Sequence, residues 1–316
     1  TTNERGHYSL LEAFGNSEAV FLARAALSDT LSVFLRGHGR MMIRPYGYPI
    51  RMERNQLERF KRWFTEYSGR FLGDDEYVNA NLRLKQEHTA RTCSEIVHLA
   101  QELALDDNEV RIAELTALFH DVGRFPQFAQ YRTYNDLRSI DHGQKGVEVL
   151  RAERVLDSLP ADERQWVQTA VGLHNRKSLP STLKGRALLF TKLVRDADKV
   201  DIFRVVMEYY RCRRDNPQSP CTWEIEIELP DTPQYNPEVL EAVMNEEAVD
   251  WAKLRTLTDA RLCQLGWVYD LNFTSSLRRI DECGYLTDLI GFLPQDDAIQ
   301  RLCRKVLEYV DLRLGR

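Results

Sequence analysis

The chain has 316 residues, 43% of them hydrophobic, which is enough to bury a large core in one big domain or a core with an appended layer. The formal net charge of −5 excludes a global basic field of the kind that attracts nucleic acid or an anionic membrane. The sequence shows no run long enough for a membrane span, no signal peptide and no C-x-x-C pair among its six cysteines, and these features predict a cytoplasmic protein with reduced thiols.

The first eighty residues are expected to form an N-terminal helical extension. Residues 1–40 carry apolar side chains at helical spacing, and the two prolines of residues 41–52 predict a turn or short hairpin. A helix is predicted from about residue 53 to residue 71, because Gly73 and the two aspartates after it end the pattern.

The next predicted helix, from about residue 81 to residue 105, has an apolar row that contains a histidine. His88 lies on the same row as Leu84 and Ile96, at steps of three and four residues, so it is a candidate metal ligand. The alternative is that His88 is a structural core residue whose ring nitrogens are hydrogen-bonded within the protein. His98 shares its row with Glu102 and is interpreted as a surface residue.

The most informative stretch is Thr116–Phe125. An apolar helix is predicted to end with His120 and Asp121 side by side, because Gly123 is expected to terminate it. A buried polar pair has to be satisfied, and imidazole with carboxylate is a combination that divalent metals bind. A single His-Asp pair is a weak signal, since one is expected by chance in a chain of this composition.

Two further histidines follow at helix ends. A loop is predicted for residues 125–140, and His142 begins the helix after it, where a histidine has little reason to pack against apolar side chains. His174 is the last core-side residue of a helix predicted for residues 162–174, and Asn175 is expected to adopt the left-handed conformation that ends it.

A long helix predicted from about residue 183 to residue 211 contains three aspartates. Asp198 and Asp201 share a row with Val194 and are embedded in an apolar stripe, where an unpartnered carboxylate costs several kcal/mol. Asp198 is therefore a candidate ligand, followed by Asp201. Asp196 shares its row with lysines and is interpreted as a solvated ion-pair partner.

The remainder of the chain has no constellation of titratable residues. Residues 223–229 alternate apolar and acidic side chains and predict a short strand, and residues 238–316 predict helices that serve packing or assembly. We expect an N-terminal extension in residues 1–80, a metal-binding core in residues 81–214 and a C-terminal segment in residues 215–316. If the chain forms a homo-oligomer, the strand is the arm that reaches the neighbouring subunit.

Five predicted elements each present a polar side chain, or a pair, toward a common interior. These residues are His88, His120, Asp121, His142, His174 and Asp198. The set has nitrogen and oxygen donors but no thiolate, and its size suits one or two divalent metal ions.

This pattern resembles the HD-domain superfamily of metal-dependent phosphohydrolases. His88, the pair His120 and Asp121, and the distant Asp198, preceded by an alanine, match the family pattern in order, and His142 and His174 lie where binuclear members have two more histidines. The resemblance covers roughly residues 80–210. It implies an all-α fold, an HD-domain helical bundle, here with a helical extension before it and a short β element and helices after it.

The resemblance also implies an activity, the hydrolysis of a phosphoester by a metal-activated water. The substrate would be a nucleotide or another small phosphate ester, and the cofactor one or two divalent ions among Mn, Fe, Co, Ni, Zn and Mg. The six residues of the constellation would be the metal ligands, and the residues expected to assist catalysis are Asp121, Arg124, Lys145 and Asp201. Arg176 and Lys199 are further cations that could contact the substrate; for each cation, a solvated surface position is the alternative.

Two other functions use the same residues. A small HD branch resembling inositol oxygenase holds two irons and activates oxygen, and a non-catalytic HD module would bind a ligand and signal through its C-terminal helices. The cyclic-di-GMP branch is set aside, because His174 is followed here by Asn175 and a loop without that branch's Gly-Tyr-Pro.

Overall fold

A computed structural model describes residues 51–216 and 229–316, which belong to one compact unit, Ile50–Arg316. Within these residues the fold is all-α, with no strand, as predicted. The helices expected in residues 1–40, nearly all of the hairpin of residues 41–52 and, apart from Leu229, the strand of residues 223–229 lie outside the described part of the chain. No helix of the described part is long and apolar enough to cross a membrane.

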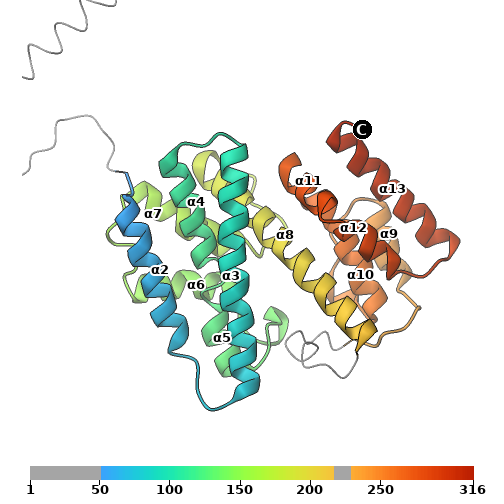
Figure 1. Cartoon of the computed structure of the whole chain (residues 1–316), viewed down its shortest axis with the longest axis horizontal. Helices are drawn as coiled ribbons and strands as arrows, with labels where there is room; N and C mark the ends of the chain where they lie inside the picture. Colours follow the sequence, from blue (N-terminus) through green and yellow to red (C-terminus); the bar gives the residue numbers. More distant parts are fainter. Residues whose placement is uncertain (1–50, 217–228) are drawn as a thin grey trace, which may run out of the picture. The chain divides into compact units, whose positions relative to one another are not determined.

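The first bundle surrounds the end of the helix that precedes His120 and Asp121 (Figure 1). Its helices are α2 (Arg54–Gly69), α3 (Glu76–Glu102), α4 (Asp107–Phe119), α5 (Arg124–Tyr131), α6 (His142–Ala152), α7 (Ala161–Leu173) and the first half of α8 (Gly185–Asp215). Helix α3 packs against α4 and α8, and α7 packs against α6 and α8. Buried aromatic and aliphatic side chains such as Phe119, Phe125 and Phe190 fill the space between them.

Aspartates begin three of the helices that carry the histidines, α3, α4 and α6. Asp75 accepts from the backbone N–H of Val78 at the start of α3, and Asp141 accepts from that of Gln144 at the start of α6. Asp106 caps α4 and forms a reciprocal capping box with Glu109. Each cap satisfies backbone donors that the first turn leaves free, which fixes where the helix starts and therefore which side chains face the core.

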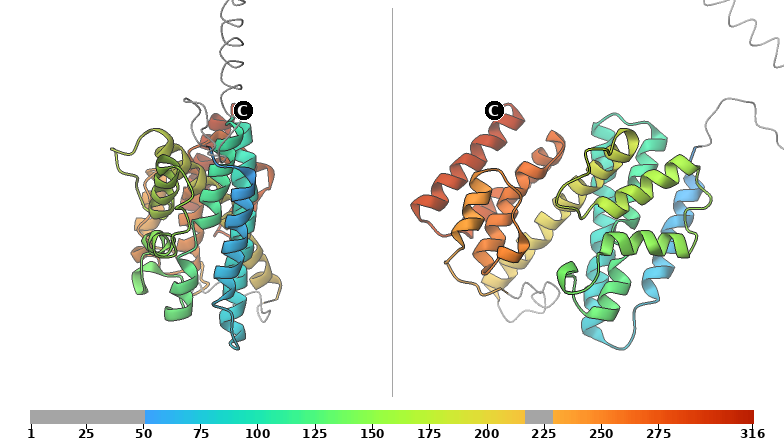
Figure 2. Two further views of the ribbon diagram at one scale, coloured as in Figure 1. Left: turned by 90° about the vertical axis from the view of Figure 1, so that its left-hand side faces the viewer. Right: turned by 180° about the vertical axis from the view of Figure 1, so that it is seen from behind.

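A second group of helices packs on the other half of α8. This group comprises α9 (Pro237–Met244), α10 (Leu257–Leu265), α11 (Thr274–Glu282), α12 (Tyr285–Gly291) and α13 (Asp297–Leu314). Phe203, Met207 and Tyr210 of α8 are buried together with Leu262 and Leu302 of this group. Figure 2 shows α8 running from the first bundle into these helices, so one helix belongs to both cores.

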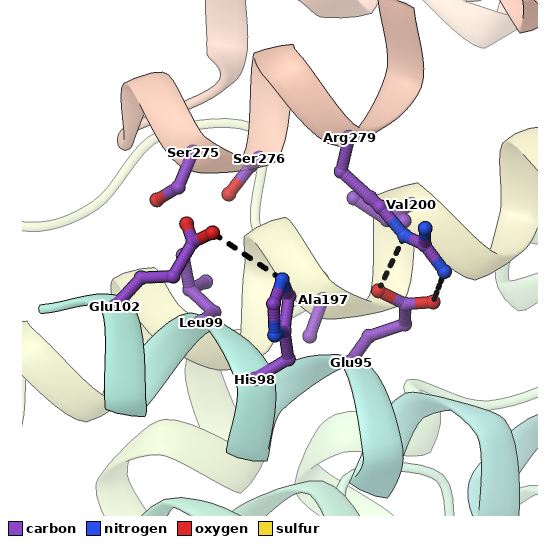
Figure 3. Close-up of a pocket in the computed structure, with 9 residues that line it drawn as sticks. All are labelled: Glu95, His98, Leu99, Glu102, Ala197, Val200, Ser275, Ser276 and Arg279. Atoms are coloured by element: carbon purple, nitrogen blue, oxygen red, sulfur yellow. Dashed lines mark hydrogen bonds and ion pairs between the residues drawn. The ribbon is translucent and has the colours of Figure 1, made fainter. Parts of the chain in front are cut away.

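Helix α11 also approaches α3, toward the C-terminal end of α3. Arg279 donates to both oxygens of Glu95 at 3.2 and 3.3 Å, and Ser275 and Ser276 face α3 across a cavity of about 10 Å³, room for a single water (Figure 3). His98 is exposed here and lies 3.3 Å from Glu102. The surface position predicted for this histidine is therefore confirmed.

Two local predictions are wrong. The segment 125–140 is not one loop, because α5 begins at Arg124 and a short 3₁₀ helix, η1 (Asp136–Arg138), follows. Pro126 lies in the first turn of α5, where no backbone hydrogen bond is lost. Asn175 is not left-handed, since its side chain is used instead to donate to two aspartates.

The thiols agree only in part with the sequence-based expectation. Cys93, Cys263, Cys283 and Cys303 are free, whereas Cys212 is disulfide-bonded. The expectation of reduced cysteines is therefore wrong for Cys212.

Candidate metal centre

Six side chains from five segments meet in the interior of the first bundle. His88 comes from α3, His120 and Asp121 from the end of α4, His142 from the start of α6, His174 from the end of α7 and Asp198 from α8. The four histidines and Asp121 are at most 5% exposed, and the Asp198 side chain is 18% exposed. The structure thus brings together every residue of the predicted constellation, with Asp198 on its most accessible side.

Each histidine is held by an acceptor on its Nδ1 side. Asp201 Oδ2 lies 2.6 Å from His88 Nδ1, and Asp136 Oδ2 lies 2.6 Å from His142 Nδ1. His120 and His174 donate from Nδ1 to the carbonyl oxygens of Ala117 and Val171, at 2.7 and 2.8 Å. Because a carbonyl oxygen can only accept, these bonds place the proton on Nδ1 and leave the Nε2 lone pair free.

The free Nε2 atoms point toward one another. His88 Nε2 is 3.2 Å from His120 Nε2, and His142 Nε2 is 3.0 Å from His174 Nε2. Two lone pairs cannot hydrogen-bond, but two imidazoles bound to one cation at about 2.1 Å and about 90° would be about 3.0 Å apart. The spacing of both pairs therefore fits nitrogen donors to a metal.

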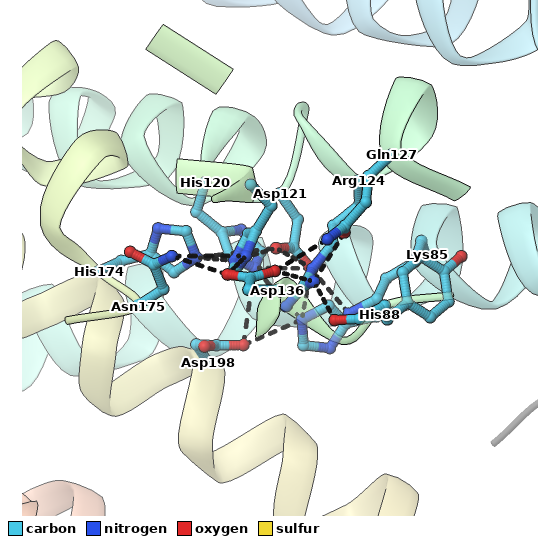
Figure 4. A network of polar contacts seen from close by, with 12 residues as sticks. Lys85, His88, His120, Asp121, Arg124, Gln127, Asp136, His174, Asn175 and Asp198 are labelled. Atoms are coloured by element: carbon cyan, nitrogen blue, oxygen red, sulfur yellow. Dashed lines mark hydrogen bonds and ion pairs between the residues drawn. The ribbon is translucent and has the colours of Figure 1, made fainter. Parts of the chain in front are cut away.

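Asp121 lies between the two histidine pairs (Figure 4). Its Oδ2 is 3.7 Å from His88 Nε2 and 3.6 Å from His120 Nε2. Its Oδ1 is 3.4 Å from His142 Nε2 and 3.7 Å from His174 Nε2. One carboxylate thus offers one oxygen to each pair, so the geometry contains two triads that share Asp121.

Asp198 joins the first triad only. Its Oδ1 lies 3.0 Å from His88 Nε2 and 3.6 Å from His120 Nε2. Burial alone would raise the pKa of this carboxyl, but His120 and His88 outweigh that effect and hold the pKa well below its usual range. Asp198 is therefore an anionic oxygen donor at neutral pH.

The ionisation of Asp121 and His142 also suits a metal. Burial would raise the pKa of Asp121, but Lys85 and His120 outweigh it and keep the pKa well below its ordinary value. Burial is the main cause and the positive charge of Arg124 the second, and together they lower the pKa of His142 to about 3. A neutral imidazole and an ionised carboxylate are the forms that coordinate divalent ions.

Two cations flank Asp121. Lys85 Nζ lies 2.8 Å from Asp121 Oδ2 and 5.2 Å from the centre of the Tyr134 ring. Arg124 donates from Nη1 to the Tyr134 carbonyl oxygen at 2.6 Å and to Asp136 Oδ1 at 2.9 Å. Its Nε is buried without a hydrogen-bond partner, 3.5 Å from Asp121 Oδ1, so this N–H remains available for another acceptor.

The other predicted cations lie outside this network. Lys145 is paired with Glu148 at 3.1 Å, Arg176 with Asp141 at 2.8 Å and Lys199 with Asp270 at 2.8 Å. No contact between these three cations and the cluster is present in the described part of the chain. Of the cations named from the sequence, Arg124 alone contacts the cluster.

Four residues of the site were missed from the sequence. Asp136 begins the three-residue helix η1 and Asn175 lies in the turn after α7, and both segments are too short for periodicity to indicate a direction. Lys85 and Arg91 lie three residues before and after His88 on α3. Arg91 donates to both oxygens of Asp201, at 2.7 and 3.1 Å. Residues three apart on a helix are neighbours, so the position of His88 already indicated Lys85 and Arg91.

Asp196 is the clearest error in the sequence interpretation. It is fully buried and accepts from the backbone N–H groups of Asn272 and Phe273, at 2.9 to 3.0 Å, and from the Asn272 amide at 2.8 Å. The periodicity of α8 predicted a solvated face, because the segment that covers this side of the helix is more than seventy residues away in sequence.

Comparison with known families agrees with this geometry, since the model of the family described as HD domain matches residues 87–202. That segment contains all six residues of the cluster. Residues 87–202 are an HD domain. The match supports assignment of this segment to the HD-domain superfamily, whose members are generally metal-dependent phosphohydrolases, and its buried His/Asp groups could hold a divalent metal. Comparison with curated proteins and with solved structures gave no match.

Proposed function

We propose that the protein hydrolyses a small phosphate ester, such as a nucleotide, at a site that holds two divalent metal ions. The observation that carries this proposal is the position of Asp121, with one carboxylate oxygen toward His88 and His120 and the other toward His142 and His174. A carboxylate so placed is suited to bridge two ions, with Asp198 as a further ligand of the first. When bound, such ions activate a water molecule and neutralise charge on a phosphoryl group.

The chain's own contribution begins with the cations beside Asp121. Lys85 lies beside Asp121 Oδ2, and the Nε of Arg124, which has no hydrogen-bond partner, lies beside Oδ1. The phosphoryl oxygens of an ester bound at the ions would arrive next to these two cations. Lys85 is 16% exposed and Arg124 15%, so charge on both is poorly screened by water. We assign both to binding the phosphoryl group and stabilising its developing charge.

Asp136 and Asp201 have a positioning role. Each holds the Nδ1 of one histidine at 2.6 Å and is itself fixed by an arginine, Asp136 by Arg124 and Asp201 by Arg91. Carboxylates in this position set the tautomer and direction of a ligating imidazole. Asp201 therefore acts through His88 rather than on the substrate.

The test is hydrolysis of a panel of nucleotides and other phosphate esters with Mn, Co, Ni, Mg and Fe. We expect Lys85→Met to lower kcat by about 100-fold with metal content unchanged, because a charge aimed at the reacting phosphoryl group is lost. Arg83→Met is the matched control, since Arg83 lies on the same helix but pairs with Glu76 at the surface.

Two results would overturn the proposal. The first is an absence of hydrolysis for every ester with every metal. The second is stoichiometric iron with oxygen uptake, which would establish the oxygenase instead, because the same six ligands serve a di-iron centre.

A further inference from the structure

A cavity of about 360 Å³ lies where the loop after α7 meets the first turns of α8 and the segment that precedes α11. It is within the size range of pockets for small ligands. The polar residues that line it are Lys177, Ser178, Ser181, Lys192, Arg195, Asp270 and Asn272, whose side-chain amide donates to Asp196. None of the residues that line it belongs to the His/Asp cluster.

The lining carries an excess of positive charge in a protein whose net charge is −5. Lys177, Lys192 and Arg195 face a single carboxylate, Asp270. That carboxylate is already neutralised, because Arg195 Nη2 and Lys199 Nζ each lie 2.8 Å from Asp270 Oδ2. The side-chain ammonium groups of Lys177 and Lys192 make no hydrogen bond or ion pair with any residue that the structure describes.

Arg195 makes the floor of the cavity rigid. Its side chain is 4% exposed and donates to the carbonyl oxygens of His174 and Arg176 and to Asp270. A buried guanidinium held by three acceptors does not move away when a ligand enters, so its charge is preorganised. The two serine hydroxyls of the loop supply further donors.

The geometry points to a binding site for a small phosphorylated anion, separate from the metal centre. Two unpaired ammonium groups, a fixed guanidinium and two hydroxyls match the several oxygens and double charge of a phosphate group. The volume exceeds that of the phosphate alone and accommodates a phosphate ester. The separation from the metal centre rests on His174, whose Nε2 faces the cluster while its carbonyl oxygen is held by Arg195.

The test is isothermal titration calorimetry with inorganic phosphate on the full-length protein. We expect Lys177→Gln and Lys192→Gln each to weaken binding by about fivefold, the effect of one partly exposed charge, and more together. Lys253→Gln is the matched control, because this lysine lies in the C-terminal group of helices and pairs with Glu238. Its affinity for phosphate should equal that of the unaltered chain.

A second variant separates this site from the proposed catalytic one. His120→Ala removes a residue of the metal centre and should leave phosphate binding at the cavity unchanged. Loss of binding in His120→Ala together with full binding in the lysine variants would place the anion at the metal centre and overturn the inference. So would an absence of phosphate binding by the unaltered chain.

The source of the phosphate is distinguished by repeating the titration with AMP in the Asp121→Ala protein, in which turnover cannot contribute heat. Tighter binding of AMP than of phosphate assigns the cavity to a phosphate ester. Equal binding assigns it to the free oxyanion. Binding of phosphate or AMP that depends on the two lysines supports the anion site even if the protein hydrolyses no ester. The anion site and the proposed hydrolysis can therefore be refuted separately.

Discussion

Each histidine of the cluster owes its direction to an acceptor on Nδ1, and two of the four acceptors are carboxylates. Asp201 is the stronger example, because its Oδ2 lies 2.6 Å from His88 Nδ1 and its two oxygens accept hydrogen bonds from two nitrogens of Arg91. Burial would raise its pKa, but the bonds from His88 and Arg91 outweigh burial and lower it. The carboxylate is therefore ionised and fixed before any metal arrives.

Asp201→Asn tests this positioning role. The amide has a single acceptor oxygen and no charge, so His88 and Arg91 can no longer both be satisfied, and affinity for Mn²⁺ should fall by about 10- to 100-fold. Binding is measured by competition with a chelator, with circular dichroism to confirm the fold. Asp157→Asn, at an exposed ion pair, is the control. Unchanged Mn²⁺ affinity in Asp201→Asn would rule out the role.

At the scale of elements, the site depends on how closely the turn after α4 approaches α6. A Cβ on Gly123 would lie 2.2 Å from the carbonyl oxygen of His142 and 2.7 Å from the backbone nitrogen of Gly146. Both contacts are with backbone, which cannot rotate out of the way. Gly123 is thus the residue that lets Asp121 and His142 approach each other.

Gly123→Ala should consequently destabilise the protein by about 1–3 kcal/mol or more and weaken metal binding at the same time, because the two segments must separate. Gly69→Ala is the control, since a Cβ there meets nothing within 4 Å. Thermal unfolding and Mn²⁺ titration measure the two effects. If Gly123→Ala matched Gly69→Ala in both, close packing at this turn would not support the site.

The elements themselves could largely be predicted, since aspartate caps and apolar rows fix α3, α4, α6 and α8. The candidate ligands other than His174 lie on these helices or directly after them, so periodicity brought them to one interior. Periodicity could not predict the direction of side chains in short connecting segments, such as Asp136. Nor could it predict the partner of a polar residue that a distant segment covers, such as Asp196. The domain boundaries expected at residues 80 and 214 stay predictions.

At the scale of the whole described chain, α8 links the metal centre to the C-terminal helices. Within little more than one turn, α8 presents Arg195 and Lys199 to Asp270, Asp196 to Asn272 and Phe273, and Asp198 to the cluster. The segment that precedes α11 therefore contacts the same turn of α8 that carries Asp198, a candidate metal ligand.

Asp196→Ala tests this coupling. Removing a buried acceptor of several hydrogen bonds should lower the free energy of unfolding by about 2–4 kcal/mol and expose the segment before α11 to proteases. Denaturant unfolding and limited proteolysis of the metal-loaded protein measure both effects. Asp215→Ala is the control, because Asp215 lies at the exposed end of the same helix. Equal stability of the two variants would contradict the coupling.

The central claim is that Asp121 is shared between two metal ions, and metal content per chain tests it most directly. Elemental analysis of the full-length protein should give about two ions in the unaltered chain, about one in His174→Ala and none in Asp121→Ala, because each histidine pair serves one ion and Asp121 serves both. A single ion in the unaltered chain, or two ions retained in Asp121→Ala, would contradict the account.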